Sequence, residues 1–197
     1  MIIAGSTLGT PDRDLAEALR LFGTAGLDAA EVIYQDDYPA AIRPSDPRSA
    51  QQAAAIADAE GVPIVALTPY TTSINSVDAA SWQQGIDEFR ACLDAAHTVG
   101  ATRVRVYAGS WHPGDTDHAR HWEQLRSALT VLAPEAADAG VVPWPDILKE
   151  LVRRGYDDVL SLEYEYRWHP QDLPDPAVGF KDSALALRKM LATVMPA

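Results

Sequence analysis

Short apolar runs rich in β-branched residues alternate along the chain with longer stretches in which apolar residues recur every three or four positions. The short runs span residues 2–6, 30–35, 63–68, 103–109 and 158–166. Clear helical stripes are formed by Ile86, Phe89, Leu93 and Ala96, and by Trp122, Leu125, Leu129, Leu132 and Ala136. This alternation is typical of a parallel β-sheet covered by α-helices.

Proline and glycine mark the expected ends of the helices. The pairs Thr10-Pro11, Asp46-Pro47 and Asp175-Pro176 each combine a capping side chain with proline, which is favoured at the first helical position. Glycine, which favours the left-handed exit from a helix, follows the helical stretches at Gly26, Gly61, Gly100, Gly140 and Gly155. No linker or low-complexity segment divides the chain, so residues 1–197 are predicted to form a single domain.

The alternation is interrupted once, between residues 135 and 155. Gly140 ends one helical stretch, and only Val141 and Val142 stand before Pro143 and a second helical stretch. Two residues are too few for a buried strand, and proline lacks the amide donor that a sheet requires. The pattern also permits an open, flavodoxin-like doubly wound sheet. Pairing of the first strand with the last would instead indicate a closed or nearly closed small barrel.

Composition excludes several classes of protein. The net charge of -12 disfavours binding to a phosphate backbone, and no apolar run approaches the roughly 20 residues of a membrane span. The first residues have no basic n-region, so we expect no signal peptide and a cytoplasmic protein. Cys92 lies within a helical stretch and is predicted to be a small core residue. The sequence contains no glycine-rich phosphate loop, so it does not indicate a nucleotide cofactor.

Four stretches carry a resemblance to a known family. "AGLDAAEVIYQ", "ALTPYTTSIN", "VGATRVRVYAG" and "LVRRGYDDVLSLEYEYRWHPQDLPDP" resemble the sugar phosphate isomerase/epimerase family, which has a xylose-isomerase-like TIM barrel. The last stretch resembles the family's final helix and eighth strand, so strands five to seven are expected to be missing. A TIM barrel typically takes about 250 residues. The expected fold is therefore an incomplete TIM barrel of about five parallel strands.

The resemblance also implies a divalent metal ion, Mn²⁺, Mg²⁺, Co²⁺ or Zn²⁺, at the C-terminal mouth of the barrel. Its ligands in the family are two Glu, an Asp and a His, and only the last Glu has a counterpart here, Glu163. A hard cation held by one carboxylate and water is bound weakly. We therefore expect metal binding to be weak or absent, and the active site of a single chain to be incomplete.

Glu163 is the candidate catalytic and metal-ligating residue. Ser161, Glu163 and Glu165 share one face of the last predicted strand, because side chains alternate along a strand. A carboxylate there can ligate a metal or move a proton next to a carbonyl group. The alternative is a polar strand end that faces solvent or pairs with Arg105 or Arg167.

Other candidates follow the predicted strands, where ligands bind in barrels and open α/β sheets. The substrate-binding candidates are Tyr70, Asn75, Arg105, His112 and Trp168. The alternative role of Asn75 is ordinary turn chemistry, that of His112 is an exposed histidine, and Trp168 could instead cover the mouth against another subunit. Glu31 and the pair Asp36-Asp37 are further possible mouth residues, although the pair better fits a solvated loop. His118 and His121 are expected to be exposed histidines rather than metal ligands.

Two functions remain open from the sequence. The first is a sugar or polyol isomerase or epimerase that uses a metal-assisted proton or hydride shift, with a small carbohydrate as its ligand. The second is a non-catalytic binding or assembly module derived from the same barrel. Removal of three strands leaves two sheet edges unpaired, which predicts a homo-oligomer.

Overall fold

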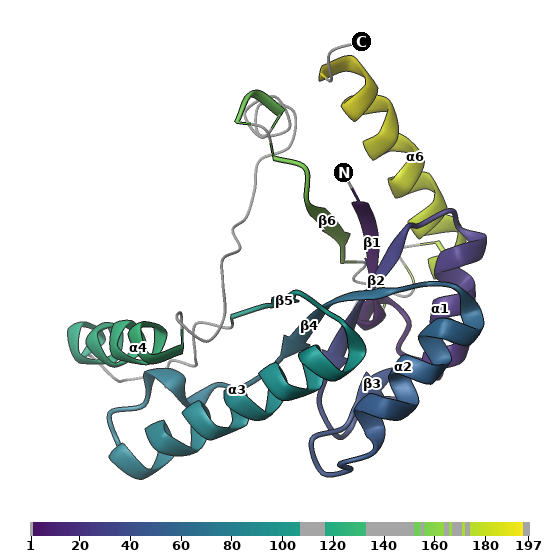
Figure 1. Cartoon of the computed structure of the whole chain (residues 1–197). Coiled ribbons are helices and arrows are strands. Elements are labelled where there is room, and N and C mark those ends of the chain that lie inside the picture. The colour runs from purple at the N-terminus through teal and green to yellow at the C-terminus, as the bar shows by residue number, and fades with distance from the viewer. Residues whose placement is uncertain are drawn as a thin grey trace.

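The computed structural model describes residues 2–106, 117–132, 152–154, 156–163, 166, 171 and 174–194 (Figure 1). The strands are β1 (Ile2–Ser6), β2 (Ala29–Tyr34), β3 (Ala41–Ile42), β4 (Ile64–Pro69), β5 (Arg103–Val104) and β6 (Val159–Leu162). The helices are α1 (Leu15–Thr24), α2 (Ser49–Glu60), α3 (Ala79–Val99), α4 (His118–Leu132) and α6 (Pro176–Val194), with short 3₁₀ turns η1 (Thr7–Gly9) and η2 (Ser73–Asn75). The Val141-Val142 junction lies outside the described residues.

The strands form a parallel sheet in the order β5-β4-β2-β1-β6, with β3 beside β2. Ile3 on β1 pairs with Leu160 on β6, and on the other side Ala4 pairs with Ala29 on β2. The first strand and the last therefore do pair. A flavodoxin-like sheet has the order 2-1-3-4-5, which this order excludes. The strands β1, β2, β4 and β5 lie side by side in chain order, as in a TIM barrel. The last strand, β6, lies beside β1, where the eighth strand of a TIM barrel would lie.

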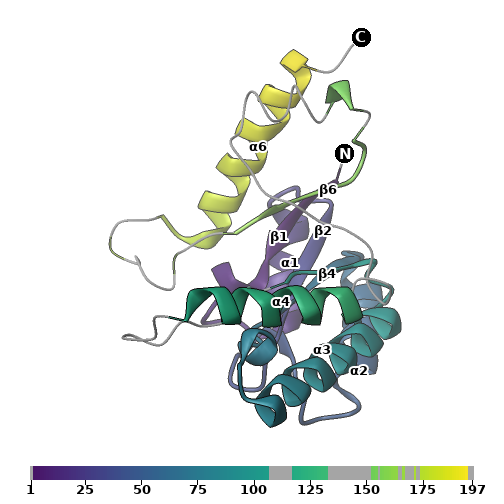
Figure 2. The ribbon, with the colours of Figure 1, turned by 90° about the vertical axis from the view of Figure 1, so that its left-hand side faces the viewer.

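One face of the sheet is covered by helices. A single core cluster joins β1, β2, β4 and β6 to α1, α2, α3 and α6. Within it, the rings of Phe22 and Phe180 meet edge to face with centroids 5.0 Å apart, so that α1 packs on α6. Figures 1 and 2 show these four helices following one another around the outside of the sheet. The described strands thus form an incomplete TIM barrel, as the sequence predicted.

The predicted strands agree with the structure in position more closely than in length. β1 has the predicted bounds, and β2 and β4 are each shifted by one residue. β5 is Arg103–Val104, the first part of the predicted 103–109, of which residues 107–109 lie outside the described residues. β6 ends at Leu162. The two-residue strand β3 was not predicted, because a single pair of apolar residues gives no periodic signal.

Two of the three predicted helix starts are wrong. Helix α1 begins at Leu15, where Asp14 and Glu17 form a reciprocal capping box, and Thr10-Pro11 lies in the turn before it. Helix α2 begins at Ser49, because Asp46-Pro47 forms a turn in which the Asp46 carbonyl accepts a hydrogen bond from the Ser49 amide. Helix α6 begins at Pro176 as predicted.

The predicted helix ends at Gly26, Gly61 and Gly100 are confirmed by their positive φ angles of 77°, 67° and 74°. Gly140 and Gly155 lie outside the described residues. Cys92 is fully buried in the core, and burial raises the pKa of its thiol, as expected of a small core residue. Within the described part of the chain, no helix has the length and apolar character needed to cross a membrane.

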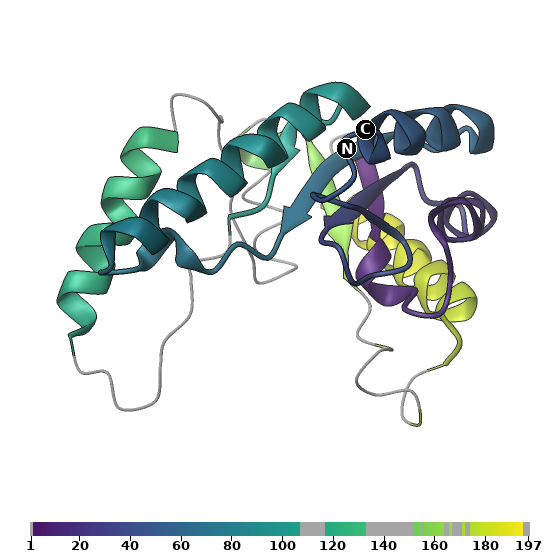
Figure 3. The same ribbon diagram turned by 90° about the horizontal axis from the view of Figure 1, so that it is seen from below.

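Asp28, which directly precedes β2, forms hydrogen bonds to the N-terminal end of β1. Its carboxylate accepts a hydrogen bond of 2.8 Å from the Ile3 amide, and its amide donates back to the Ile3 carbonyl. Arg188 of α6 donates to the same carboxylate at 2.8 Å and to the Gly26 carbonyl at 3.0 Å. The last helix is therefore tied to the start of the sheet at the end opposite the barrel mouth. Figure 3 shows α6, in yellow, beside the sheet in the view from below.

Gly85 permits α3 to pack closely on η2, which precedes it at the mouth. A Cβ atom at Gly85 would lie 2.9 Å from the Ile74 backbone nitrogen and 2.9 Å from the Ser73 carbonyl carbon. We expect Gly85→Ala to lower the free energy of unfolding by about 1–3 kcal/mol, because backbone atoms cannot yield to the added methyl group. Urea denaturation followed by circular dichroism measures this change.

Gly23→Ala is the matched control, because a Cβ atom there meets a single side-chain methyl group of Val62 at 3.2 Å. Alanine is the better helix former by roughly 0.5–1 kcal/mol, so this variant should be neutral or slightly more stable. Equal destabilisation by the two substitutions would contradict the close contact between α3 and η2.

Candidate functional site

The face of the sheet turned away from the helices carries a group of polar side chains. Ala30 and Val32 on β2 belong to the helix-covered core, so Glu31 between them points to the opposite face. Glu31 is 9% exposed, and its carboxylate accepts a hydrogen bond from the Thr68 hydroxyl of β4. Glu31, a possible mouth residue from the sequence, thus lies within β2.

Glu163 lies on this same face. Leu160 and Leu162 of β6 pack toward the helices, so Ser161 and Glu163 point away from them. Val104 of β5 likewise packs on the core, which turns Arg103 and Arg105 to the polar face. We call this polar face the inner face and define it by Glu31, Thr68, Arg105, Ser161 and Glu163.

Arg105 and Glu163 form an ion pair across the inner face. The Arg105 Nη1 atom donates to the Glu163 Oε2 atom at 3.1 Å, and the two side chains are 44% and 38% exposed. The structure therefore brings together two of the residues that the sequence selected, in the pairing named as the alternative role of Glu163. Solvent reaches the pair, so it contributes little to stability on its own.

A second ion pair joins the same two strand edges. Arg103 donates to the carboxylate of Asp158, which directly precedes β6 and also caps the Val159 amide. Neither Arg103 nor Asp158 was singled out from the sequence. The signal for Arg103 was the alternation along the short run at 103–109, which places it on one face with Arg105.

Ser161 carries a hydroxyl group on the inner face. Its Oγ atom is buried and makes no hydrogen bond among the described residues. Buried polar atoms in folded proteins almost always have a partner, which can be the protein, water or a ligand. Ser161 precedes Glu163 by two residues on the same face, so its hydroxyl is available to a ligand bound beside the Arg105–Glu163 pair.

Tyr70 lies in a separate hollow at the rim of the mouth. This hollow has a volume of about 360 Å³ and is lined by Tyr34, Gln35, Asp36, Pro44, Tyr70, Thr71, Glu88 and Ala91. Burial is the main cause that raises the pKa of Tyr34 to about 12. Asp36 is exposed, as expected of a solvated loop, and two hydrogen bonds from Ser45 lower the pKa of its carboxyl group.

Asn75 occupies a buried position under α3 and α4. It is 2% exposed, and its carbonyl oxygen lies 2.8 Å from the Nδ1 atom of His121, which therefore donates the hydrogen bond. His121 is 6% exposed, so the expectation of an exposed histidine is wrong at this position. The reason is that α4 packs on η2 and α3 through Leu125 and Leu132, which turns this face of α4 inward.

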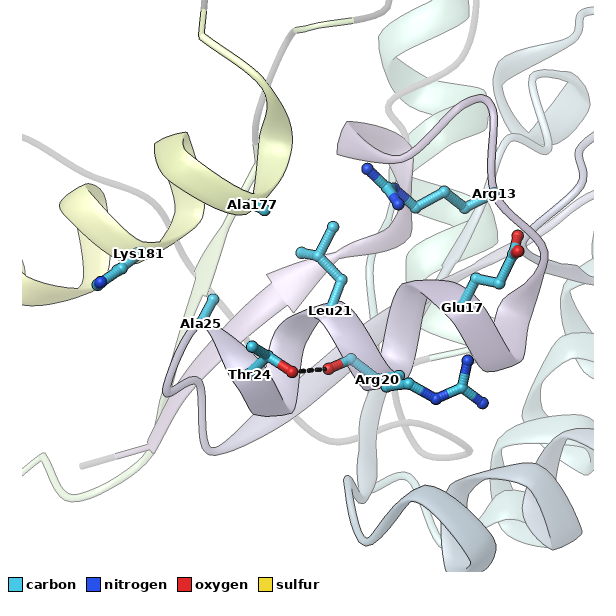
Figure 4. A pocket seen from close by; sticks show the side chains of 8 residues that line it. All are labelled: Arg13, Glu17, Arg20, Leu21, Thr24, Ala25, Ala177 and Lys181. Carbon is cyan, nitrogen blue, oxygen red and sulfur yellow. Dashed lines mark hydrogen bonds between the residues drawn. The ribbon is translucent and has the colours of Figure 1, made fainter.

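A larger hollow lies on the outside of the molecule. It measures about 440 Å³ and is lined by Arg13, Glu17, Arg20, Leu21, Thr24, Ala25, Ala177 and Lys181 of α1, α6 and the turn before α1 (Figure 4). None of the residues selected from the sequence lines it. Ligands of parallel α/β folds bind at the C-terminal ends of the strands, so we assign the candidate site to the inner face rather than to this groove.

The remaining candidates lie outside the part of the chain that the structure describes. These are His112 and Trp168, together with Glu165 and Arg167. Among the residues that are described, no group of three or more His, Cys, Asp or Glu side chains is placed to hold a metal ion. Glu163 and Glu31, the two carboxylates of the inner face, are bonded to Arg105 and Thr68. The described residues alone do not fit a divalent ion, which needs several oxygen or nitrogen ligands.

Comparison with known proteins supports the same architecture. A family described as xylose isomerase-like TIM barrel matches residues 19–142, more than half of the 197 residues. No curated protein matches the chain.

Several solved structures are similar in fold. A D-tagatose 3-epimerase-like protein superposes with a TM-score of 0.72 at 12% identity, over 98% of this chain and 99% of that one. L-ribulose 3-epimerase gives 0.70 at 14% identity, over 98% and 95%. D-psicose 3-epimerase from Clostridium cellulolyticum H10, solved with D-tagatose, gives 0.69 at 10% identity, over 100% of both chains. At these identities the similarity establishes the fold alone.

Proposed function

Because the chain belongs to the xylose isomerase-like TIM barrel family, we propose that it is a sugar or polyol isomerase/epimerase-like protein whose inner face binds a small carbohydrate. One observation carries the proposal. A carboxylate, Glu163, and a guanidinium group, Arg105, meet 3.1 Å apart at the C-terminal ends of the strands. The fold similarity to sugar 3-epimerases supports the class of ligand.

The two groups suit a proton transfer beside a carbonyl group. In the proposed step Glu163 accepts a proton from the carbon next to the carbonyl, and the electron pair of that C–H bond moves to form an enediolate. An N–H group of Arg105 donates to the oxygen on which negative charge develops. Return of the proton to the carbon completes the reaction, and its return from the other face would need a second acid.

The active site of this single chain is proposed to be incomplete. A proton or hydride shift assisted by a metal, which the resemblance implies, requires ligands in addition to Glu163. Arg105 and Glu163 alone provide one base and one electrophile. The site in one chain is therefore expected to bind a sugar and exchange a proton more readily than to convert one epimer into another.

Exchange of solvent deuterium into a sugar tests the proposal. The sugars are D-tagatose and D-allulose, which are named with structurally similar epimerases. In D₂O, proton NMR should show loss of the C–H signal next to the carbonyl group in the presence of the wild-type protein. Glu163→Gln should slow this exchange by at least about 100-fold, because the amide cannot accept the proton.

Glu123→Gln is the matched control. Glu123 also pairs with an arginine, Arg126 at 2.7 Å, but on the exposed surface of α4. This variant should exchange deuterium at the wild-type rate. Equal rates in the wild type and Glu163→Gln, or no exchange and no binding of either sugar, would exclude the proposed chemistry.

A second candidate function is an assembly module derived from the barrel. The outer edges of β5 and β6 have no strand partner within the described residues, and Val106, which follows β5, is 44% exposed. Unpaired edges favour association with another chain, so we propose a homo-oligomer.

Sedimentation velocity over a range of concentrations should show a dimer or larger species, which Val106→Lys weakens by placing a charge at the edge. A monomer at all concentrations would contradict the assembly function.

A further inference from the structure

The charge at Glu163 is already balanced within this chain. Arg105 directly follows β5, and Glu163 directly follows β6. The two residues are 58 positions apart in sequence, and their strands lie at opposite edges of the sheet. A guanidinium group carries its positive charge throughout the physiological pH range. Its Nη1 atom donates to the Glu163 Oε2 atom, one of the two oxygen atoms through which this carboxylate could bind a metal ion.

A divalent ion at this carboxylate would meet two obstacles. An ion bound to the Glu163 Oε2 atom would lie about 2 Å from that oxygen, and the Arg105 Nη1 atom lies 3.1 Å from it. The two positive charges would repel each other, although the water that reaches this exposed pair weakens the repulsion. The inner face also offers too few ligands, since its other described carboxylate, Glu31, is nearly buried and bonded to Thr68.

The position of Arg105 is fixed by its surroundings. Arg103, two residues earlier on the same face, is bonded to Asp158 at the start of β6. The Arg105 amide donates to the Leu67 carbonyl of β4 at 2.8 Å, which anchors the backbone. These two contacts hold the end of β5 in a position from which Arg105 faces Glu163.

We infer that Arg105 supplies at Glu163 the positive charge that a divalent ion would otherwise supply, so that the inner face binds its ligand without a metal. Only the identity of that ligand as a carbohydrate rests on the proposed function. Removal of the guanidinium group while the aliphatic stem is kept should therefore free Glu163 to bind a cation.

Electron paramagnetic resonance of free Mn²⁺ in solution measures this directly. The wild-type protein should leave the Mn²⁺ signal unchanged at submillimolar concentrations. Arg105→Met should raise the affinity for Mn²⁺ by at least about tenfold, since it removes one repelling charge beside the carboxylate. The double variant Arg105→Met/Glu163→Gln should lose that gain.

Arg126→Met is the control, because Arg126 pairs with Glu123 in the same way on α4. A gain in Mn²⁺ affinity as large as that of Arg105→Met would mean that any freed surface carboxylate suffices, and would overturn the inference. Tight Mn²⁺ binding by the wild type, or no gain in Arg105→Met, would overturn it as well. Circular dichroism confirms that each variant is folded.

The same proteins separate this inference from the proposed function. Deuterium exchange into D-tagatose by the wild type should be equal in EDTA and in Mn²⁺. Exchange that requires Mn²⁺ would overturn the metal-independent site. If neither sugar binds while Arg105→Met still gains Mn²⁺ affinity, the carbohydrate proposal fails and the charge replacement by Arg105 stands.

Discussion

The parallel pairing of β1 with β6 is the constraint on which the arrangement of the inner face depends. Ile3 pairs with Leu160 and Gly5 with Leu162, so the strand from the C-terminal part of the chain continues the sheet beyond the first strand. On its other side β1 pairs with β2, and there Ser6 of β1 pairs with Glu31 of β2. Glu31 and Glu163 therefore flank β1, with about 10 Å between their strands. Without this pairing, Glu163 would have no defined relation to β2 or β5.

The inner face is polar because its two outer strands end in charged residues. The helix-covered face takes apolar residues from β1, β2, β4 and β6, and alternation sends Glu31 and Ser161, which lie between such residues, inward. Arg103 lies in β5 and Arg105 directly follows it. Asp158 directly precedes β6 and Glu163 directly follows it, and each arginine pairs with one of these carboxylates. In a complete barrel further strands would stand between these edges. Here the edges are linked by ion pairs between side chains, which links the architecture of the sheet to the charge of the candidate site.

Much of the fold was predictable from local pattern. The strand β1, the glycine-terminated helices and the stripe of Ile86 and Phe89 on α3 all follow from periodicity and backbone preference, which are properties of neighbouring residues. The start of α1 was mispredicted because two capping signals compete within five residues. The Thr10 hydroxyl donates a hydrogen bond back to the Thr7 carbonyl, so Thr10 does not cap the helix. Asp14 caps it instead, through the capping box with Glu17.

The candidate site was predictable only in part. Alternation along a strand assigned Glu163 to a face, and the resemblance selected it among the acidic residues. Neither could choose between a metal, solvent and Arg105 as its neighbour, because that choice depends on how far apart the two sheet edges lie. The burial of His121 escaped prediction for a similar reason, since it results from the packing of α4 on η2.

The pairing of β1 with β6 is measured most directly by the cross-strand nuclear Overhauser effect in isotopically labelled protein. The parallel register of the structure predicts contacts between backbone protons of residues 3 and 160 and of residues 5 and 162. Contacts from residues 159–162 to a strand other than β1, or their absence while the β1–β2 contacts persist, would contradict it. In that case Glu163 would not be held on the inner face, and its pairing with Arg105 would have no structural basis.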